Sequence, residues 1–300
     1  MSRPPVRPSS EGRKLPGARF LMARFGPKAA EDEDDQRPIP ASGGGGGLTL
    51  RAMLPNAITA AALCSGLTGI RFATEGMWAF AIGLVVLAGV LDGFDGRVAR
   101  LLNAQSRFGA ELDSLADSLS FGVAPALIVF MWSLEGWSTF GWLAALAFAI
   151  CCALRLARFN ARIDLDDQPH KSAGFLTGVP APVGAGLAFT PFYLWNETGI
   201  ELFRDPVLNT VWLAVIASLM ISNLPTLSWG SIRPRRSVRL PLIAFTGLAF
   251  AALLLEPWWT LAAISIGYLL LMPYGLVKYG RIRQRRMQDA AAAAPAPGAA

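Results

Sequence analysis

Two neighbouring acidic runs organise this chain: Asp92-Gly-Phe-Asp95-Gly96-Arg-Val-Ala99-Arg100 and, eight residues later, Gly109-Ala-Glu-Leu-Asp113-Ser-Leu-Ala-Asp117. Asp92 and Asp95 are three residues apart, and Asp113 and Asp117 are four apart, so each pair lies on one face of a helix. These four residues, called the Asp quartet below, sit where two long apolar segments meet. Charge in an apolar segment is costly and marks a functional site by default.

The apolar residues gather into runs long enough to cross a membrane. Hydrophobic residues make up 53% of the 300 residues and charged residues only 16%. Runs of about twenty apolar residues cross a membrane as helices, whereas the strands of a membrane barrel are shorter and alternate apolar with polar residues. The sequence therefore predicts an all-α, polytopic membrane helix bundle of about eight transmembrane helices. The expected spans are 54–71, 77–100, 108–132, 139–158, 178–196, 207–226, 240–255 and 257–277.

Lys and Arg are distributed unevenly between the connections. With the amino terminus inside, sixteen fall in the inner connections, helix ends and carboxyl tail, against two, Arg71 and Arg204, outside. Such an excess marks the cytoplasmic side. We therefore expect an integral protein of the cell membrane, with both termini and the Asp quartet on the cytoplasmic side. The net charge of +6 then needs no nucleic acid as partner.

The composition of the quartet predicts a metal site. Carboxylates crowded in a poorly hydrated site cannot all stay ionised without a cation. Cys64, Cys151 and Cys152 lie in apolar segments, and His170 is the single histidine. The expected metal site therefore has carboxylate ligands and no thiolate or imidazole ligands. Oxygen ligands alone suit Mg²⁺ or Mn²⁺. Two such ions about 4 Å apart could clamp a diphosphate, which points to phosphoryl-type transfer at a membrane surface.

Other interpretations of the quartet are open. The acids could form interfacial salt bridges with Arg97, Arg100 and Arg107. They could also be the ion site of a cation transporter, which would place them near the bilayer midplane on broken helices. Gly96 and Gly109 favour a binding site, because they remove side-chain bulk where a backbone or a ligand approaches closely.

The acidic runs resemble a known family signature. Written with its fixed positions, the stretch reads Asp92-x-x-Asp95-Gly96-x-x-Ala99-Arg100, eight residues, Gly109-x-x-x-Asp113-x-x-x-Asp117. It resembles the signature of the CDP-alcohol phosphotransferase family at every fixed position. Three further strings resemble the phosphatidylserine synthase branch: 108–125, 154–160 and 175–182. The turn 221–230 is less aromatic and basic than is usual in that branch. The resemblance runs from about Leu54 to the sixth span.

The resemblance implies a six-helix catalytic core, usually dimeric, that displaces CMP from a CDP-linked membrane lipid with an alcohol. The quartet would ligate two Mg²⁺ or Mn²⁺ ions, and Asp117 would also be the catalytic base that takes the proton of the attacking hydroxyl. The nucleotide site would comprise Gly96, Ala99, Arg100 and Gly109. Residues 48–287 would form this membrane catalytic domain. Residues 1–47, which end in five glycines, and the Ala/Pro-rich 288–300 are expected to be disordered tails.

The branch implies L-serine as the acceptor, hence transfer of the phosphatidyl group of CDP-diacylglycerol to serine. Serine's carboxylate needs a cation beside the metal site, and Arg155 or Arg158 could hold a carboxylate or phosphate by two parallel bonds. Arginines are also expected there from topology alone. Asn56 could reach the nucleotide or simply cap a helix. The alternatives are another alcohol (inositol phosphate, glycerol phosphate or choline) and a non-catalytic membrane scaffold.

Overall fold

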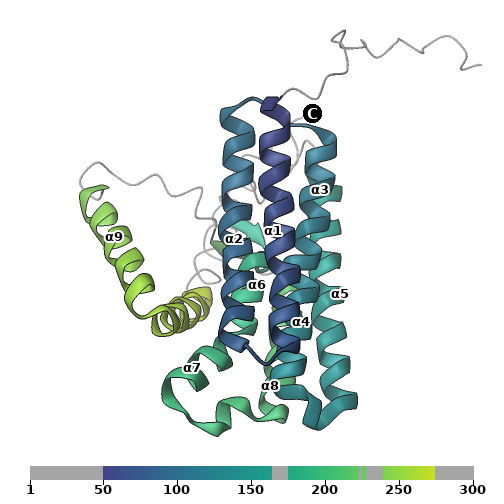
Figure 1. Ribbon diagram of the computed structural model, residues 1–300, viewed down its shortest axis with the longest axis vertical. Helices are drawn as coiled ribbons and strands as arrows, with labels where there is room; N and C mark the ends of the chain where they lie inside the picture. The colour runs from purple at the N-terminus through teal and green to yellow at the C-terminus, as the bar shows by residue number, and fades with distance from the viewer. Residues whose placement is uncertain (1–49, 164–174, 223–224, 228–238, 274–300) are drawn as a thin grey trace, which may run out of the picture. The chain divides into compact units, whose positions relative to one another are not determined.

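The computed structural model describes residues 50–163, 175–222, 225–227 and 239–273. The predicted tails and His170 lie outside these ranges. The described helices (Figure 1) are α1 Leu50–Thr74, α2 Trp78–Leu101, α3 Arg107–Asp117, α4 Ala124–Val129, α5 Ser138–Ile163, α6 Ala181–Ala188, α7 Thr190–Thr198, α8 Pro206–Ile221, α9 Arg239–Leu255 and a last helix, Pro257–Pro273. Two π-helical segments, η2 Ser118–Val123 and η3 Phe130–Leu134, continue α3 and α4, and short 3-10 turns lie at Glu135–Trp137 and Glu201–Arg204.

The helices are those of a polytopic membrane bundle, as predicted. Three stretches are long and apolar enough to cross a membrane: Met53–Thr74, Trp78–Leu101 and Arg107–Ala161. The third contains two passes, because the chain turns at Glu135–Trp137 and α5 packs back against α4. The shorter apolar helices are α8, α9 and the last helix. With the α6–α7 pair, the described residues form eight apolar helical segments that correspond to the eight expected spans.

Helix α1 packs against both acid-bearing helices, α2 and α3 (Figure 1). Glycines permit the close approach. A Cβ added at Gly66 would lie 2.7 Å from Ser120 Oγ, and one added at Gly69 would lie 2.8 Å from the Ala81 carbonyl oxygen. Small residues let helix backbones come together in this way in membrane bundles. The two helices that carry the acids are therefore both supported by α1.

Three of the expected spans differ in detail. The third span is a continuous helix but becomes π-helical directly after Asp117, a feature frequent at functional sites. The fifth span breaks at Phe189, because Pro191 in the first turn of α7 cannot donate a backbone hydrogen bond. The sixth span ends at Ile221 rather than at 226. Pro225–Leu227 (β2) instead pairs antiparallel with Phe175–Thr177 (β1).

Gly178 connects this two-stranded ribbon to the bundle. Its φ is 76°, in the left-handed region that favours glycine. A Cβ there would lie 2.5 Å from the carbonyl oxygen of Met220 and 2.9 Å from that of Ser222. The next residue, Val179, donates its backbone N–H to the Leu219 carbonyl at 3.4 Å. The chain can therefore pass from β1 into α6 against the end of α8 only with a glycine here.

We expect Gly178→Ala to destabilise the protein by about 1–2 kcal/mol through its backbone conformation and by a further 1–3 kcal/mol, roughly, through overlap with the α8 carbonyls. Gly199→Ala is the matched control. Gly199 also has a positive φ, 66°, but an added Cβ meets no atom within 4 Å. Thermal unfolding midpoints in detergent measure both effects. Equal shifts for the two variants would contradict the steric part of this explanation.

Candidate active site

The Asp quartet converges between α2 and α3. One carboxylate oxygen from each of Asp92, Asp95 and Asp113 lies within 4.8 Å of the others. Asp117, one turn further along α3, is within hydrogen-bonding reach of Asp92. Two short runs of sequence on antiparallel helices thus bring four carboxylates to one place.

Thr59 on α1 holds the most buried member of the quartet. Asp95 is 5% exposed, and its Oδ2 accepts a 2.6 Å hydrogen bond from Thr59 Oγ1. The same hydroxyl lies 3.1 Å from the Pro55 carbonyl oxygen. A hydroxyl has one proton to donate, and an ionised carboxylate is the stronger acceptor. Thr59 therefore fixes the orientation of Asp95 whenever that carboxylate is charged.

Reasoning from the sequence missed Thr59. Its signal was its position one helical turn after Pro55 and Asn56, at a buried point of an apolar segment. A threonine in such a segment also satisfies itself by bonding to the carbonyl four residues earlier. The contact with Asp95 depends on how α1 packs against α2, which no local pattern specifies.

The donor set fits a hard divalent cation. Carboxylate oxygens are the ligands that Mg²⁺ and Mn²⁺ prefer. Within the described ranges, Arg97, Arg100 and Arg107 form no ion pair with the quartet, and the ion pair seen there joins Arg71 to Glu75 at 3.4 Å. These three arginines thus do not pair with the carboxylates, which removes the support for the salt-bridge interpretation. Three of them could hold a metal ion.

The predicted nucleotide-binding residues have different surroundings. A Cβ added at Gly96 would meet no atom within 4 Å, so space beside Asp95 is open. One added at Gly109 would lie 2.9 Å from Asn56 Oδ1 and 3.1 Å from Ser106 Oγ. Ser106 caps α3 by accepting a 3.0 Å hydrogen bond from the Gly109 N–H. Gly109 therefore lets Asn56 approach the first turn of α3. The remaining two residues lie in the last turn of α2: Ala99 and Arg100.

Helix α5 contacts both the α8 end and α3. Arg158 Nη2 donates to the Ser222 carbonyl oxygen at 3.2 Å, which ties α5 to the end of α8. Asn160 Nδ2 donates to Ser114 Oγ at 2.8 Å, and Ser114 lies on α3 next to Asp113. Asn160 is the last residue of the 154–160 string, and this hydrogen bond links it to the acid-bearing helix α3.

Arg155 differs from Arg158. Its Nε is buried and has no hydrogen-bond partner among the described residues. Its guanidinium lies within electrostatic range of Asp117. Of the two predicted acceptor arginines, Arg155 thus interacts electrostatically with the quartet, and Arg158 makes a contact between α5 and the end of α8.

Comparison with known proteins agrees with the site. The model of the family described as CDP-alcohol phosphatidyltransferase matches residues 52–224. The chain belongs to this family. A second model, CDP-alcohol phosphatidyltransferase 2, matches residues 237–273. The similarity of this CDP-alcohol phosphatidyltransferase to known families therefore extends beyond the sixth span, the limit expected from the sequence motifs, to α9 and the last helix.

Several relatives bear the name CDP-diacylglycerol–serine O-phosphatidyltransferase. The Mycobacterium tuberculosis protein is 37% identical over 224 residues, which cover 75% of this chain and 78% of that protein. The Helicobacter pylori protein is 31% identical over 227 residues, which cover 76% and 91%. The Saccharomyces cerevisiae protein is 43% identical over 141 residues, which cover 41% and 50%.

We expect Thr59→Val to weaken Mn²⁺ binding by the quartet roughly 10–100-fold, the usual effect of losing a residue that orients a metal ligand. Thr59→Ser keeps the hydroxyl and is the matched control, with near-normal affinity. Electron paramagnetic resonance of free Mn²⁺ in solutions of the purified protein measures metal binding without turnover. Unchanged affinity in Thr59→Val would show that the hydrogen bond does not position Asp95.

Proposed function

We propose that this CDP-alcohol phosphatidyltransferase moves the phosphatidyl group of CDP-diacylglycerol to the hydroxyl of L-serine, giving phosphatidylserine and CMP. The observation that carries the proposal is the convergence of four carboxylates from α2 and α3 at one site. The choice of serine is supported by two relatives named CDP-diacylglycerol–serine O-phosphatidyltransferase, which are 37% and 31% identical over about three quarters of the chain.

The quartet is the proposed metal site. Two Mg²⁺ or Mn²⁺ ions held by it would neutralise the diphosphate and the charge that develops at phosphorus. Asp92, Asp95 and Asp113 provide oxygens already near one another. Thr59 and the Asn160–Ser114 hydrogen bond hold the two helices that carry them.

Asp117 is the proposed base. Its carboxylate accepts the proton of the serine hydroxyl as the new serine O–P bond forms and the P–O bond to CMP breaks. A base must lie within hydrogen-bond reach of the hydroxyl. Asp117 is at the end of α3, in contact with Asp92 and within electrostatic range of Arg155, so a serine held by Arg155 would present its hydroxyl nearby.

The two substrates are proposed to bind to different residues around the quartet. The open space at Gly96 would receive the cytidine nucleotide, with Ala99, Arg100, Gly109 and Asn56 around it. Arg155 would hold serine's carboxylate by two parallel hydrogen bonds, and its buried Nε is then satisfied by the substrate. The runner-up acceptors are inositol phosphate, glycerol phosphate and choline.

The setting of the reaction is part of the proposal. The excess of Lys and Arg on one side supports an active site and both termini on the cytoplasmic side of the cell membrane. Residues 48–287 would be the catalytic domain, with disordered tails 1–47 and 288–300. The family resemblance supports a homodimer.

The test is release of CMP by the purified protein from CDP-diacylglycerol with Mn²⁺ or Mg²⁺. We expect release that depends on serine. Release with another alcohol but not with serine would change the acceptor, and no release with any alcohol would contradict the proposal.

In the same assay Asp117→Asn should lose about 10²–10⁴-fold in turnover, the usual contribution of a general base. Glu111→Gln, an exposed acid on the same helix, is the control and should remain active.

We expect Arg155→Lys to raise the KM for serine about tenfold with a smaller change in kcat, because an ammonium cannot form the two parallel bonds. Arg158→Lys is the comparison. It should affect the thermal unfolding midpoint more than the KM, because Arg158 joins α5 to α8. Steady-state kinetics at varied serine measures both. A normal KM in Arg155→Lys, or the larger KM effect in Arg158→Lys, would reverse the assignment.

A further inference from the structure

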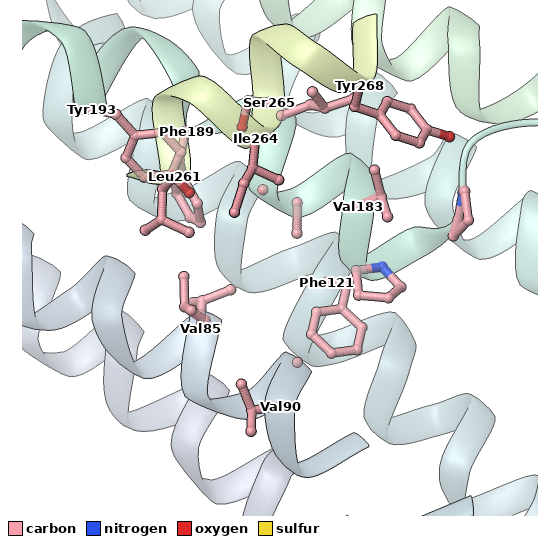
Figure 2. A pocket seen from close by; sticks show the side chains of 17 residues that line it. Val85, Val90, Phe121, Val183, Phe189, Tyr193, Leu261, Ile264, Ser265 and Tyr268 are labelled. Carbon is pink, nitrogen blue, oxygen red and sulfur yellow. The ribbon is translucent and has the colours of Figure 1, made fainter. Parts of the chain in front are cut away.

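An apolar cavity of about 590 Å³ lies between α2, α6, α7 and the last helix. This is within the range of about 300–1,000 Å³ usual for ligand sites. Figure 2 shows side chains from three sides of it, among them Val85, Phe121, Val183, Phe189 and Ile264. The lining is almost wholly hydrocarbon, so the cavity suits an apolar ligand.

The cavity begins one helical turn from the Asp quartet. Gly89 lines it and precedes Asp92 by three residues, and Phe121 lines it and follows Asp117 by four. A Cβ at Gly89 would come within 3.6 Å of the Phe121 ring and 3.9 Å of Pro182. Glycine at this position therefore keeps open the end of the cavity that is nearest to the acids.

The length of the cavity matches one lipid chain. Its lining runs from Pro182 on α6, past the break at Phe189, to Tyr193 on α7, which is at most about 16 Å at helical rise. Half of a hydrocarbon layer is about 15 Å thick, which is the depth that one acyl chain occupies in its leaflet. At the far end lie Tyr193, Phe189 and Leu261 (Figure 2), the first two almost fully buried.

We propose that this cavity holds one acyl chain of the CDP-linked lipid substrate and that its depth sets the chain length the enzyme prefers. The inference rests on the proposed function, which puts the lipid's phosphates at the quartet. A lipid anchored there must extend an apolar chain away from the acids, and the cavity opens one turn away. Leu261, Ile264, Ser265 and Tyr268 form its wall on the last helix.

The last helix has a role in this proposal because it forms one wall of the cavity. It lies outside the residues 52–224 that match the first family model and inside the 237–273 that match the second. Because the surrounding bilayer is as apolar as the cavity, burial alone gives a chain no preference for the cavity. Selection must come from shape, and the last helix supplies one of the surfaces that determine this shape.

The experiment shortens the cavity without disturbing the site. Gly186 lines the cavity, and an added Cβ there meets no atom within 4 Å, so the side chain of Gly186→Leu can start toward the cavity without a clash at its Cβ. Gly83→Leu is the matched control, because Gly83 on α2 has equally open surroundings and does not line the cavity. Serine-dependent CMP release is measured with CDP-dipalmitoylglycerol and with CDP-dioctanoylglycerol.

We expect Gly186→Leu to lower kcat/KM about tenfold for the dipalmitoyl lipid and less than twofold for the dioctanoyl lipid. In Gly83→Leu the kcat/KM values for the two lipids should be unchanged. An equal change for the two lipids in Gly186→Leu would overturn the inference while leaving the proposed function intact.

A second measurement does not depend on turnover. CDP-diacylglycerol with a photoreactive diazirine at the end of one acyl chain should label Leu261 or Ile264, and unlabelled CDP-diacylglycerol should compete. Phosphatidylcholine with the same diazirine chain is the comparison. Equal labelling by phosphatidylcholine, without competition, would show that the cavity takes bulk lipid, and would overturn the inference even if CMP release is observed.

Discussion

Repulsion among four carboxylates in an apolar bundle is the constraint on which the rest of the structure depends. Three of them have oxygens within 4.8 Å of one another, and within the described residues Arg97, Arg100 and Arg107 form no ion pair with them. Such an arrangement is unfavourable unless a cation joins it. The protein must therefore hold the acids in place before the cation binds, and this requires α2 and α3 to be fixed by other elements.

Helix α1 meets most of this requirement. Thr59 donates to Asp95 on α2, and Asn56 approaches Gly109 on α3, so one face of α1 contacts both acid-bearing helices. Further down, Gly66 lets its backbone pack against Ser120. From the other side, Asn160 on α5 bonds to Ser114. The acids are thus positioned by neutral donors and by close packing, which leave their charge available for a metal ion.

The sequence predicted those features that depend on spacing along one helix. The shared helix face of Asp92 and Asp95, and that of Asp113 and Asp117, follow from three- and four-residue intervals. The Thr59 contact does not, because it depends on the packing of α1 against α2. The same holds for the end of the sixth span, where apolar residues continue past Ile221 but Pro225 pairs with β1 instead. Hydropathy alone does not predict tertiary contacts of this kind.

The division between polar site and apolar cavity occurs within one turn of α2. Val85, Val86 and Gly89 face the cavity, and Asp92 begins the quartet. A helix repeats its faces every three to four residues, so one side of α2 changes from hydrocarbon to carboxylate over about 5 Å. A ligand bound along that side must make the same change over the same distance. A lipid with a phosphate next to its acyl chains does so, and a soluble nucleotide does not. The arrangement on α2 is therefore itself an argument that the substrate on this side is a lipid with a phosphate in its head group.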